Sequence, residues 1–359
     1  MLLRKMLRDL KNNAAQFLSI FLMIFLGVFI FSGMTSIGQG MKQSSQDYYD
    51  ETHLADAIIY SSFFTDQDYE RLRSSFGIEN VTKRLQMDTT YGSDGATTIQ
   101  LNVISSDALS GCHLIEGEAF DGDMDGIWLD SEFAKAQQIK TGDTINVTCQ
   151  NNVFTKTVKG LVMQPEYVYA VQNNNEIVPD HKRFGYAFMP EEAWSLGPVP
   201  YTQALLKTED LSKNDLESRV TEVLPGKTTM LVMQEDIPSV AMFRNEIDQM
   251  SAVGSVYPVV FLIIAILTTL TTMTRITADQ RVQIGTLKAL GIRNRKITLH
   301  YLSFGLLVGG AGSILGVFTG PVFLPPLVFG FQKSMYTMPW WNSAVTPVVY
   351  GMAFICFLI

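Results

Sequence analysis

Long stretches without a charged side chain constrain this chain more than any other feature. Residues 12–41, 249–274 and 334–359 contain no charged side chain, and residues 297–332 contain only His300. Each run is longer than the roughly 20 apolar residues that cross the hydrocarbon core of a bilayer. The sequence therefore predicts an α-helical membrane protein, with spans at 15–37, 251–273, 299–324 and 344–359.

The two ends of the chain raise separate expectations. The basic start and apolar middle of the first 34 residues are also typical of a signal peptide. No A-x-A-like site follows, however, and the apolar run is longer than the about 7–15 residues of a signal peptide, so an uncleaved anchor is favoured. The final run ends abruptly within apolar residues, which predicts a truncated protein with an incomplete fourth span.

Charge is segregated between the regions that flank the spans. Residues 1–14 and 274–298 are basic, whereas residues 38–250 carry 16 Lys and Arg against 33 Asp and Glu. Short basic flanks stay in the cytoplasm, and long domains cross the membrane largely regardless of their charge. We expect a multi-pass plasma membrane protein with a cytoplasmic N-terminus and an extracytoplasmic domain at 38–250. A further extracytoplasmic loop is expected at 325–343.

The region 38–250 is long enough to form its own hydrophobic core, and it combines strand and helix patterns. Residues 97–105 alternate like a strand, and residues 143–162 are typical of two strands that turn at Asn151 and Asn152. Thr65 or Asp66 is expected as the N-cap of one short helix that ends at Gly77, and Ser131 as the N-cap of another. The fold class is thus a membrane protein with an inserted mixed α+β domain.

Two short motifs in this domain match chemical sites incompletely. The stretch LPGKTT at 224–229 resembles the end of a phosphate-binding loop, but Thr221 stands where that pattern requires glycine. The stretch DGDMDG at 121–126 spaces carboxylates like a calcium loop, with Glu132 at the twelfth position. Because a strand entering a helix follows it, and no helix precedes it, a solvated acidic turn is favoured. The motifs predict neither nucleotide nor calcium binding.

Histidine and cysteine also indicate no site. The four histidines are scattered, without an H-x-x-x-H pair or a neighbouring cysteine pair that would suggest zinc. Cys112 and Cys149 lie in the domain expected outside, where a disulfide and two free thiols are equally supported. Cys356 is expected to pack as a small apolar residue in the fourth span. Nothing in the sequence supports an enzyme.

The third span carries glycines three or four residues apart. These glycines are Gly305, Gly309, Gly312, Gly316 and Gly320. Small residues at this spacing allow a second helix to approach to backbone contact, so the stripe predicts close helix packing. Pro321, Pro325 and Pro326 follow, and they predict that the helix ends there.

A short amphipathic helix is predicted in the basic segment 274–298. Thr277 and Gln280 are spaced as a capping box, and Gly291 is a natural residue to follow the last helical turn. The helix is predicted to carry three apolar residues on one face, at positions i, i+3 and i+6. They are Ile284, Leu287 and Leu290. The residues alone leave two interpretations open, a helix that lies on anionic lipid and a helix that docks a cytosolic partner.

A family resemblance bears on this choice. The order of one span, a large domain and three spans, with QRVQIGTLKALGIRNRKI after the second, resembles the permease subunits of FtsX-like or MacB-like ABC transporters. The most specific parts are QIGTLKALG at 283–291 and the glycine-rich span after it, followed by GIWLDSEFAKAQQIKTGDTINV at 126–147. FLSIFLMIFLGVFIFSGM and YYDETHLADA resemble long bacterial permeases that carry two four-span modules, of which this chain would be the first.

The resemblance implies a non-enzymatic permease that has no cofactor of its own. A separate cytosolic ATPase would bind ATP and Mg and dock on the segment 274–298. The docking residues implied are Gln283, Ile284, Leu287, Lys288, Leu290, Gly291, Arg293 and Arg295. Many relatives have glutamate at the position of Gln283, so no ionic role is assigned to it.

The resemblance also implies further partners and an activity. Partners would be membrane lipid, a second module or second copy, and an extracytoplasmic protein, peptide or lipid, with no nucleic acid. The activity would be ATP-driven extrusion of an amphipathic substrate such as a lipid or peptide. The alternatives are a mechanotransmission or peptide-sensing regulator that transports nothing, and a membrane receptor without an ATPase.

Overall fold

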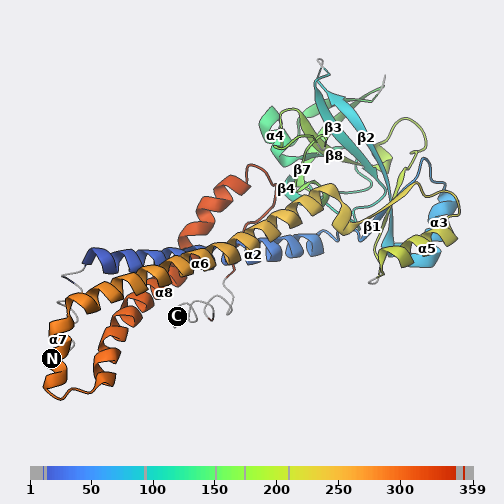
Figure 1. Cartoon of the computed structure of the whole chain (residues 1–359). Coiled ribbons are helices and arrows are strands. Elements are labelled where there is room, and N and C mark those ends of the chain that lie inside the picture. Colours follow the sequence, from blue (N-terminus) through green and yellow to red (C-terminus); the bar gives the residue numbers. More distant parts are fainter. Residues whose placement is uncertain are drawn as a thin grey trace. The chain divides into compact units, whose positions relative to one another are not determined.

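The computed structural model describes residues 11, 14–92, 95–149, 152–173, 175–208, 211–344 and 351. The chain divides into two compact units. The first consists of Met1–Gln43, Glu246–Gly330 and Trp341–Ile359, and the second of Ser44–Asn245 and Phe331–Trp340. Figure 1 shows long helices in the first unit and a strand-rich fold in the second. Each unit is described separately below.

Three long helices dominate the first unit. They are α2 (Ala14–Glu51), α6 (Pro238–Asp279) and α8 (Asn294–Gln332). Each is long and apolar enough to cross a membrane. The first three predicted spans lie within these helices, and all three helices extend beyond them. The fourth predicted span, 344–359, lies outside the described residues except at 344 and 351.

The prolines of the third span do not end its helix, and that prediction was wrong. Helix α8 continues through Pro321, Pro325 and Pro326 to Gln332, which moves the start of the predicted 325–343 loop. A bilayer offers no water to a freed backbone group, so a proline in a membrane helix is accommodated by neighbouring helices. Here Leu324, between the prolines, packs against Gly33 of α2.

The second unit is built on a 10-stranded mixed sheet in the order β10-β1-β9-β2-β3-β8-β5-β7-β4, with β6 pairing with β2 and β7. The strands are β1 (Ala57–Tyr60), β2 (Val81–Tyr91), β3 (Thr97–Ile104), β4 (His113–Gly117), β5 (Ile127–Asp130), β6 (Thr144–Cys149), β7 (Asn152–Met163), β8 (Phe184–Pro190), β9 (Gln203–Leu206) and β10 (Met230–Met233). The β3–β8 and β5–β7 pairs are parallel, and the other pairs are antiparallel. The strand predicted at 97–105 is confirmed by β3, and the strand pair predicted at 143–162 is confirmed by β6 and β7.

Short helices pack on this sheet. They are α3 (Asp66–Phe76), α4 (Ser131–Gln137) and α5 (Lys213–Val223), with 3-10 turns η1 (Ile78–Asn80), η2 (Pro165–Tyr167), η3 (Glu191–Ala193) and η4 (Gln234–Asp236). Of the two predicted N-caps, Thr65 rather than Asp66 caps α3, and it does so in a full capping box with Asp68. Ser131 does not cap α4, because the Asp130 carboxylate one residue earlier accepts the Glu132 N–H at 3.0 Å. Leu72, Phe133 and Leu216 bring these helices into one buried core with the strands.

The incomplete motifs have structural roles. The Lys227 ammonium, in the LPGKTT stretch, pairs with the buried Asp68 carboxylate at 2.7 Å and so anchors a turn to α3. Asp125, in the DGDMDG stretch, pairs with Lys156. Within the described ranges, no group of three or more His, Cys, Asp or Glu side chains could hold a metal ion. Cys112 and Cys149 are both free thiols, which settles the alternative that the sequence left open.

Candidate functional site

Helix α7 (Arg281–Ala289) connects α6 to α8. The capping box expected from Thr277 and Gln280 is wrong, because α6 continues past Thr277, whose hydroxyl donates to the Met273 carbonyl at 2.7 Å within that helix. Gln280 is the N-cap of α7, but its side chain makes no capping hydrogen bond. It instead accepts a hydrogen bond from the Tyr301 hydroxyl at 2.7 Å. This bond fixes the corner between α6 and α7 to the first turns of α8.

Gly291 terminates α7, as its position predicts. The glycine has φ +81°, in the left-handed region. Its N–H bonds to the Lys288 carbonyl at 3.0 Å, and the N–H of Ile292 bonds to the Leu287 carbonyl at 3.1 Å. These two bonds define a Schellman motif. Both ends of α7 are therefore fixed by named hydrogen bonds.

The residues predicted to share one face of α7 do not share it. Ile284 and Leu287 are half-buried, whereas Leu290 is 74% exposed. Each residue turns the helix by about 100°, so six residues place Leu290 roughly 120° from Ile284. Val282, which the sequence analysis missed, is 82% exposed and lies nearly opposite Ile284. Val282 and Leu290 are eight residues apart, a spacing that is typical of one helical face, so the sequence could have indicated that these two residues lie on the same side.

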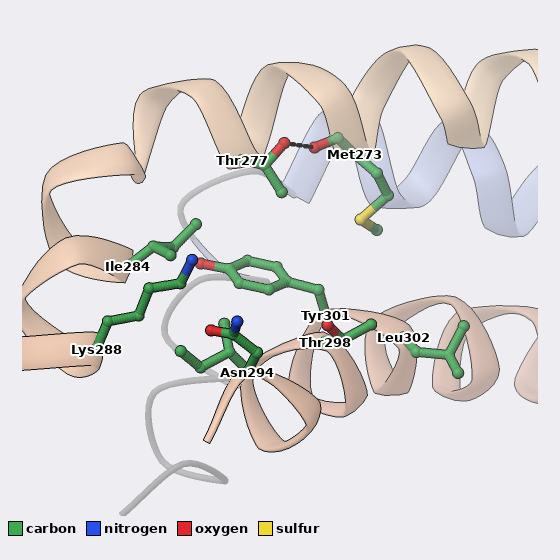
Figure 2. Close-up of a pocket in the computed structure, with 9 residues that line it drawn as sticks. Met273, Thr277, Ile284, Lys288, Asn294, Thr298, Tyr301 and Leu302 are labelled. Carbon is green, nitrogen blue, oxygen red and sulfur yellow. Dashed lines mark hydrogen bonds between the residues drawn. The ribbon is translucent and has the colours of Figure 1, made fainter. Parts of the chain in front are cut away.

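Only Ile284 and Leu287 of α7 are not exposed, and we call the side opposite Ile284 its outer face. It consists of Val282, Thr286, Ala289 and Leu290. The opposite, inner face carries Ile284 and Lys288 and borders a pocket of about 540 Å³. Figure 2 shows Ile284 and Lys288 reaching towards Tyr301 of α8, with Met273 of α6 on the far side of its ring. The structure thus separates the predicted docking residues into two groups.

The remaining predicted docking residues flank the outer face. Gln283 is exposed on α7, and Arg293 and Arg295 are exposed after Gly291. Asp279 is the only acidic residue in the sequence between residues 249 and 344. The connection between α6 and α8, residues 280–293, therefore presents two exposed apolar side chains, Val282 and Leu290, within a positively charged segment.

The glycine stripe of α8 meets α2. A Cβ added to Gly312 would lie 3.1 Å from the Phe21 carbonyl oxygen, and one on Gly316 would lie 2.9 Å from the Phe29 nitrogen. A Cβ on Gly320 would lie 3.0 Å from the Gly33 nitrogen. These three glycines therefore pack directly against the α2 backbone.

The other two glycines of the stripe differ. Gly309 makes only ordinary contact, 3.5 Å from the Ile24 Cδ1 atom, and no heavy atom of the described chain lies within 4 Å of a Cβ at Gly305. The prediction of close packing at Gly305 was wrong, because at that level Phe17 and Phe304 fill the space between α2 and α8 with stacked rings 5.4 Å apart.

Helix α2 also carries glycines that the sequence analysis did not single out. A Cβ on Gly27 would lie 3.0 Å from Phe261 Cβ, and one on Gly38 would lie 3.0 Å from Ser251 Oγ. Both partners belong to α6. Eleven residues make about three helical turns, so Gly27 and Gly38 lie on one face, and this spacing could have revealed them. Within the first unit, α2 therefore packs closely against both α6 and α8.

A buried ion pair in the second unit was also missed. The Arg84 guanidinium, 1% exposed, pairs with the Glu166 carboxylate at 2.8 Å and donates from Nε to Gln203 Oε1 at 2.6 Å. Burial disfavours the charged guanidinium, but the Glu166 carboxylate outweighs burial and raises the pKa of Arg84. The pair joins β2 to η2. Its partners lie far apart in the sequence, so no local pattern could predict it.

Comparisons with known proteins agree with this architecture. Residues 18–250 match the family described as the MacB-like periplasmic core domain, and residues 255–359 match the FtsX-like permease C-terminal family. No curated protein matches the chain. Among solved structures, the chain is similar to the extracellular domain of the noncanonic ABC-type transporter YknZ from Gram-positive bacteria. The identity is 15%, the coverage is 50% of this chain and 99% of that domain, and the TM-score of 0.35 is too low to support an inference.

Proposed function

This chain belongs to the family of FtsX-like permeases with a MacB-like periplasmic core domain, and on that basis we propose that it docks a separate cytosolic ATPase on the outer face of α7. The chain itself would supply no catalytic residue and no cofactor, since ATP and Mg would be bound by the ATPase. We propose a bacterial plasma membrane location on the basis of the family, and the basic flanks of the spans support a cytoplasmic N-terminus and a cytoplasmic α7.

The observation that carries the proposal is the exposure of Val282 and Leu290 on a short helix that lies between two predicted spans. Both side chains are more than two-thirds exposed, and α7 is too short to span a membrane itself. An amphipathic helix of this kind can enter a hydrophobic groove of a partner. Arg293 and Arg295 would then meet an acidic rim of that groove. Gln283 lies beside this contact.

The hydrogen bonds at the two ends of α7 would transmit a movement of α7 to α6 and α8. The Tyr301–Gln280 hydrogen bond and the Schellman motif at Gly291 connect α7 to both neighbouring helices. Displacement of α7 by the ATPase would therefore move α6 and α8. Glycine packing would transmit that movement to α2. Helices α2, α6 and α8 each contain residues of both units, so the chain connects to the second unit through all three helices.

We propose that this movement serves extrusion of an amphipathic substrate such as a lipid or peptide. In support, the predicted spans contain no Lys, Arg, Asp or Glu, and His300 is their one ionisable side chain, whereas ion pathways through membrane helices are marked by several ionisable residues. A second module or second copy would complete the membrane unit. In the regulatory alternative, docking of the ATPase would move the extracytoplasmic domain, and no substrate would be transported. ATP hydrolysis by the purified complex that is stimulated by a lipid or peptide would favour extrusion.

Substitution of the outer face tests the docking proposal. We expect Val282→Asp and Leu290→Asp to abolish co-purification of the ATPase, because each places a charge in an apolar contact at a cost of several kcal/mol. The variants should still fractionate with membranes. Asn294→Asp adds the same charge to the same connection, off the outer face, and should keep the ATPase bound. Equal ATPase recovery from all three variants would contradict the proposal.

A further inference from the structure

The inner face of α7 borders a pocket that the docking proposal does not use. We propose that this pocket binds one anionic phospholipid, with its phosphate at Lys288 and an acyl chain among the apolar residues of α6, α7 and α8. The pocket, of about 540 Å³, is large enough for part of such a molecule. The inference does not depend on the docking of an ATPase.

The pocket has an apolar interior. Its apolar lining comes from Met273 at the end of α6, Ile284 of α7, and Ile297, the Tyr301 ring and Leu302 of α8. Figure 2 shows the Tyr301 ring lying across the pocket, with Ile284 pointing towards it. A free inorganic phosphate would gain nothing from these side chains, whereas an acyl chain would be removed from water against them. The lining therefore favours an amphipathic ligand.

Most polar residues of the pocket gather on one side. Three of the four polar lining residues, Lys288 of α7 and Asn294 and Thr298 at the start of α8, line the pocket there. The fourth, Thr277 of α6, lies across the pocket, and its hydroxyl donates to the Met273 carbonyl. An ammonium provides three hydrogen-bond donors for phosphate oxygens, and an amide and a hydroxyl add neutral donors. The surrounding connection is basic, with Asp279 its only acidic residue. This charge favours an anionic head group over a zwitterionic one.

The position of the pocket selects a lipid rather than a protein segment. The pocket lies where the charge-free run of α6 ends at Thr274 and where the run of α8 that contains only His300 begins at Ile297, which is the level expected for lipid head groups. The outer face, which points away from the pocket, is the side available to a cytosolic protein. A bound lipid would hold α7 against α8 and so stiffen the connection.

Lipid retention by the purified full-length chain tests the proposal. The delipidated protein in detergent would be titrated with dioleoylphosphatidylglycerol or dioleoylphosphatidylcholine, and bound lipid counted by native mass spectrometry. We expect one phosphatidylglycerol to be retained, with Lys288→Gln weakening its binding about fivefold, the effect of one basic residue on an anionic lipid. Lys296→Gln removes an equal charge outside the pocket and should weaken binding clearly less than Lys288→Gln does.

Filling the pocket provides a second, independent variant. Leu302→Trp keeps every charge but occupies the apolar interior, so it should also lose the phosphatidylglycerol. Circular dichroism and gel filtration would show whether each variant remains folded. The proposal is overturned if Leu302→Trp, still folded, retains the lipid, if Lys288→Gln and Lys296→Gln weaken binding equally, or if phosphatidylcholine binds as well. Displacement of the lipid by inorganic phosphate alone would also overturn it, since the site would then recognise only an anion.

Discussion

The Tyr301 hydroxyl donates a hydrogen bond to Gln280 Oε1 at 2.7 Å, which links the start of α8 to the corner between α6 and α7. The two residues are separated by the whole of α7 and its terminating loop. Because this bond joins the residue before α7 to the helix that follows it, α7 is held in a junction of three helices rather than in a free loop. Its exposed outer face is therefore presented on a rigid support.

Removal of the Tyr301 hydroxyl should loosen α7 without unfolding the protein. A neutral hydrogen bond contributes about 1 kcal/mol, so Tyr301→Phe should leave the spans intact while backbone amides of 281–289 exchange faster. Hydrogen exchange measured by mass spectrometry on the full chain would detect this. Tyr257→Phe, at an exposed position in α6, is the matched control. Unchanged exchange at 281–289 in Tyr301→Phe would show that the bond does not hold the corner.

Two glycines of the connection should respond in opposite directions to alanine. Gly291 has φ +81°, so Gly291→Ala should cost about 1–2 kcal/mol and fray the end of α7. Gly285 lies within the helix, with nothing within 4 Å of an added Cβ, so Gly285→Ala should stabilise α7 by up to about 1 kcal/mol. Hydrogen exchange of α7 in each variant measures both effects. Equal protection in the two variants would be inconsistent with the Schellman termination.

The glycine stripe should tolerate a larger side chain at one end only. Gly316→Leu would force atoms into the α2 backbone and should cost roughly 1–3 kcal/mol, whereas Gly305→Leu enters open space. The apparent melting temperature of the detergent-purified full chain measures the difference. A loss of stability in Gly305→Leu as large as that in Gly316→Leu would contradict the observed packing.

Asp130 should make the second unit less stable as pH rises. Burial raises the pKa of Asp130 to about 7. The protonated acid therefore stabilises the fold below the unfolded pKa of about 3.9, and this stabilisation is lost as pH rises to about 7. For this one group, the free energy of unfolding falls by at most about 1.4 kcal/mol per pH unit in this range.

Asp130→Asn keeps an acceptor for the Glu132 N–H but does not titrate. The free energy of unfolding of the variant should no longer fall between pH 5 and 7. At pH 8 the variant should be more stable than the unsubstituted chain. Thermal unfolding of the full chain, followed by tryptophan fluorescence at several pH values, would measure both effects. Identical pH profiles for the two proteins would show that Asp130 does not titrate in this range.

The features that the sequence predicted are those that local patterns determine. Apolar runs without Lys, Arg, Asp or Glu located three spans, alternation located β3, and the N-cap candidates Thr65 and Asp66 located the start of α3. Each depends on residues close together in the chain. The end of α8 was mispredicted because the effect of Pro321 depends on the helices around it.

The division of α7 into two faces needed the structure. The sequence placed Ile284 and Leu290 on one side, but only the position of Tyr301 shows that Ile284 faces inwards. Leu287→Asp, at a half-buried position beside the Schellman motif, would consequently disturb the helix as well as any contact. The Arg84–Glu166 pair likewise joins strands and turns that no local pattern connects.

Photo-cross-linking from the two faces of α7 tests the central claim most directly. The photoreactive residue p-benzoylphenylalanine would replace Leu290 on the outer face or Lys288 on the inner face, in cells that also produce the ATPase. We predict that position 290 cross-links a protein that 8-azido-ATP labels, and that position 288 does not. Cross-linking of that protein from position 288 but not from 290 would contradict docking on the outer face.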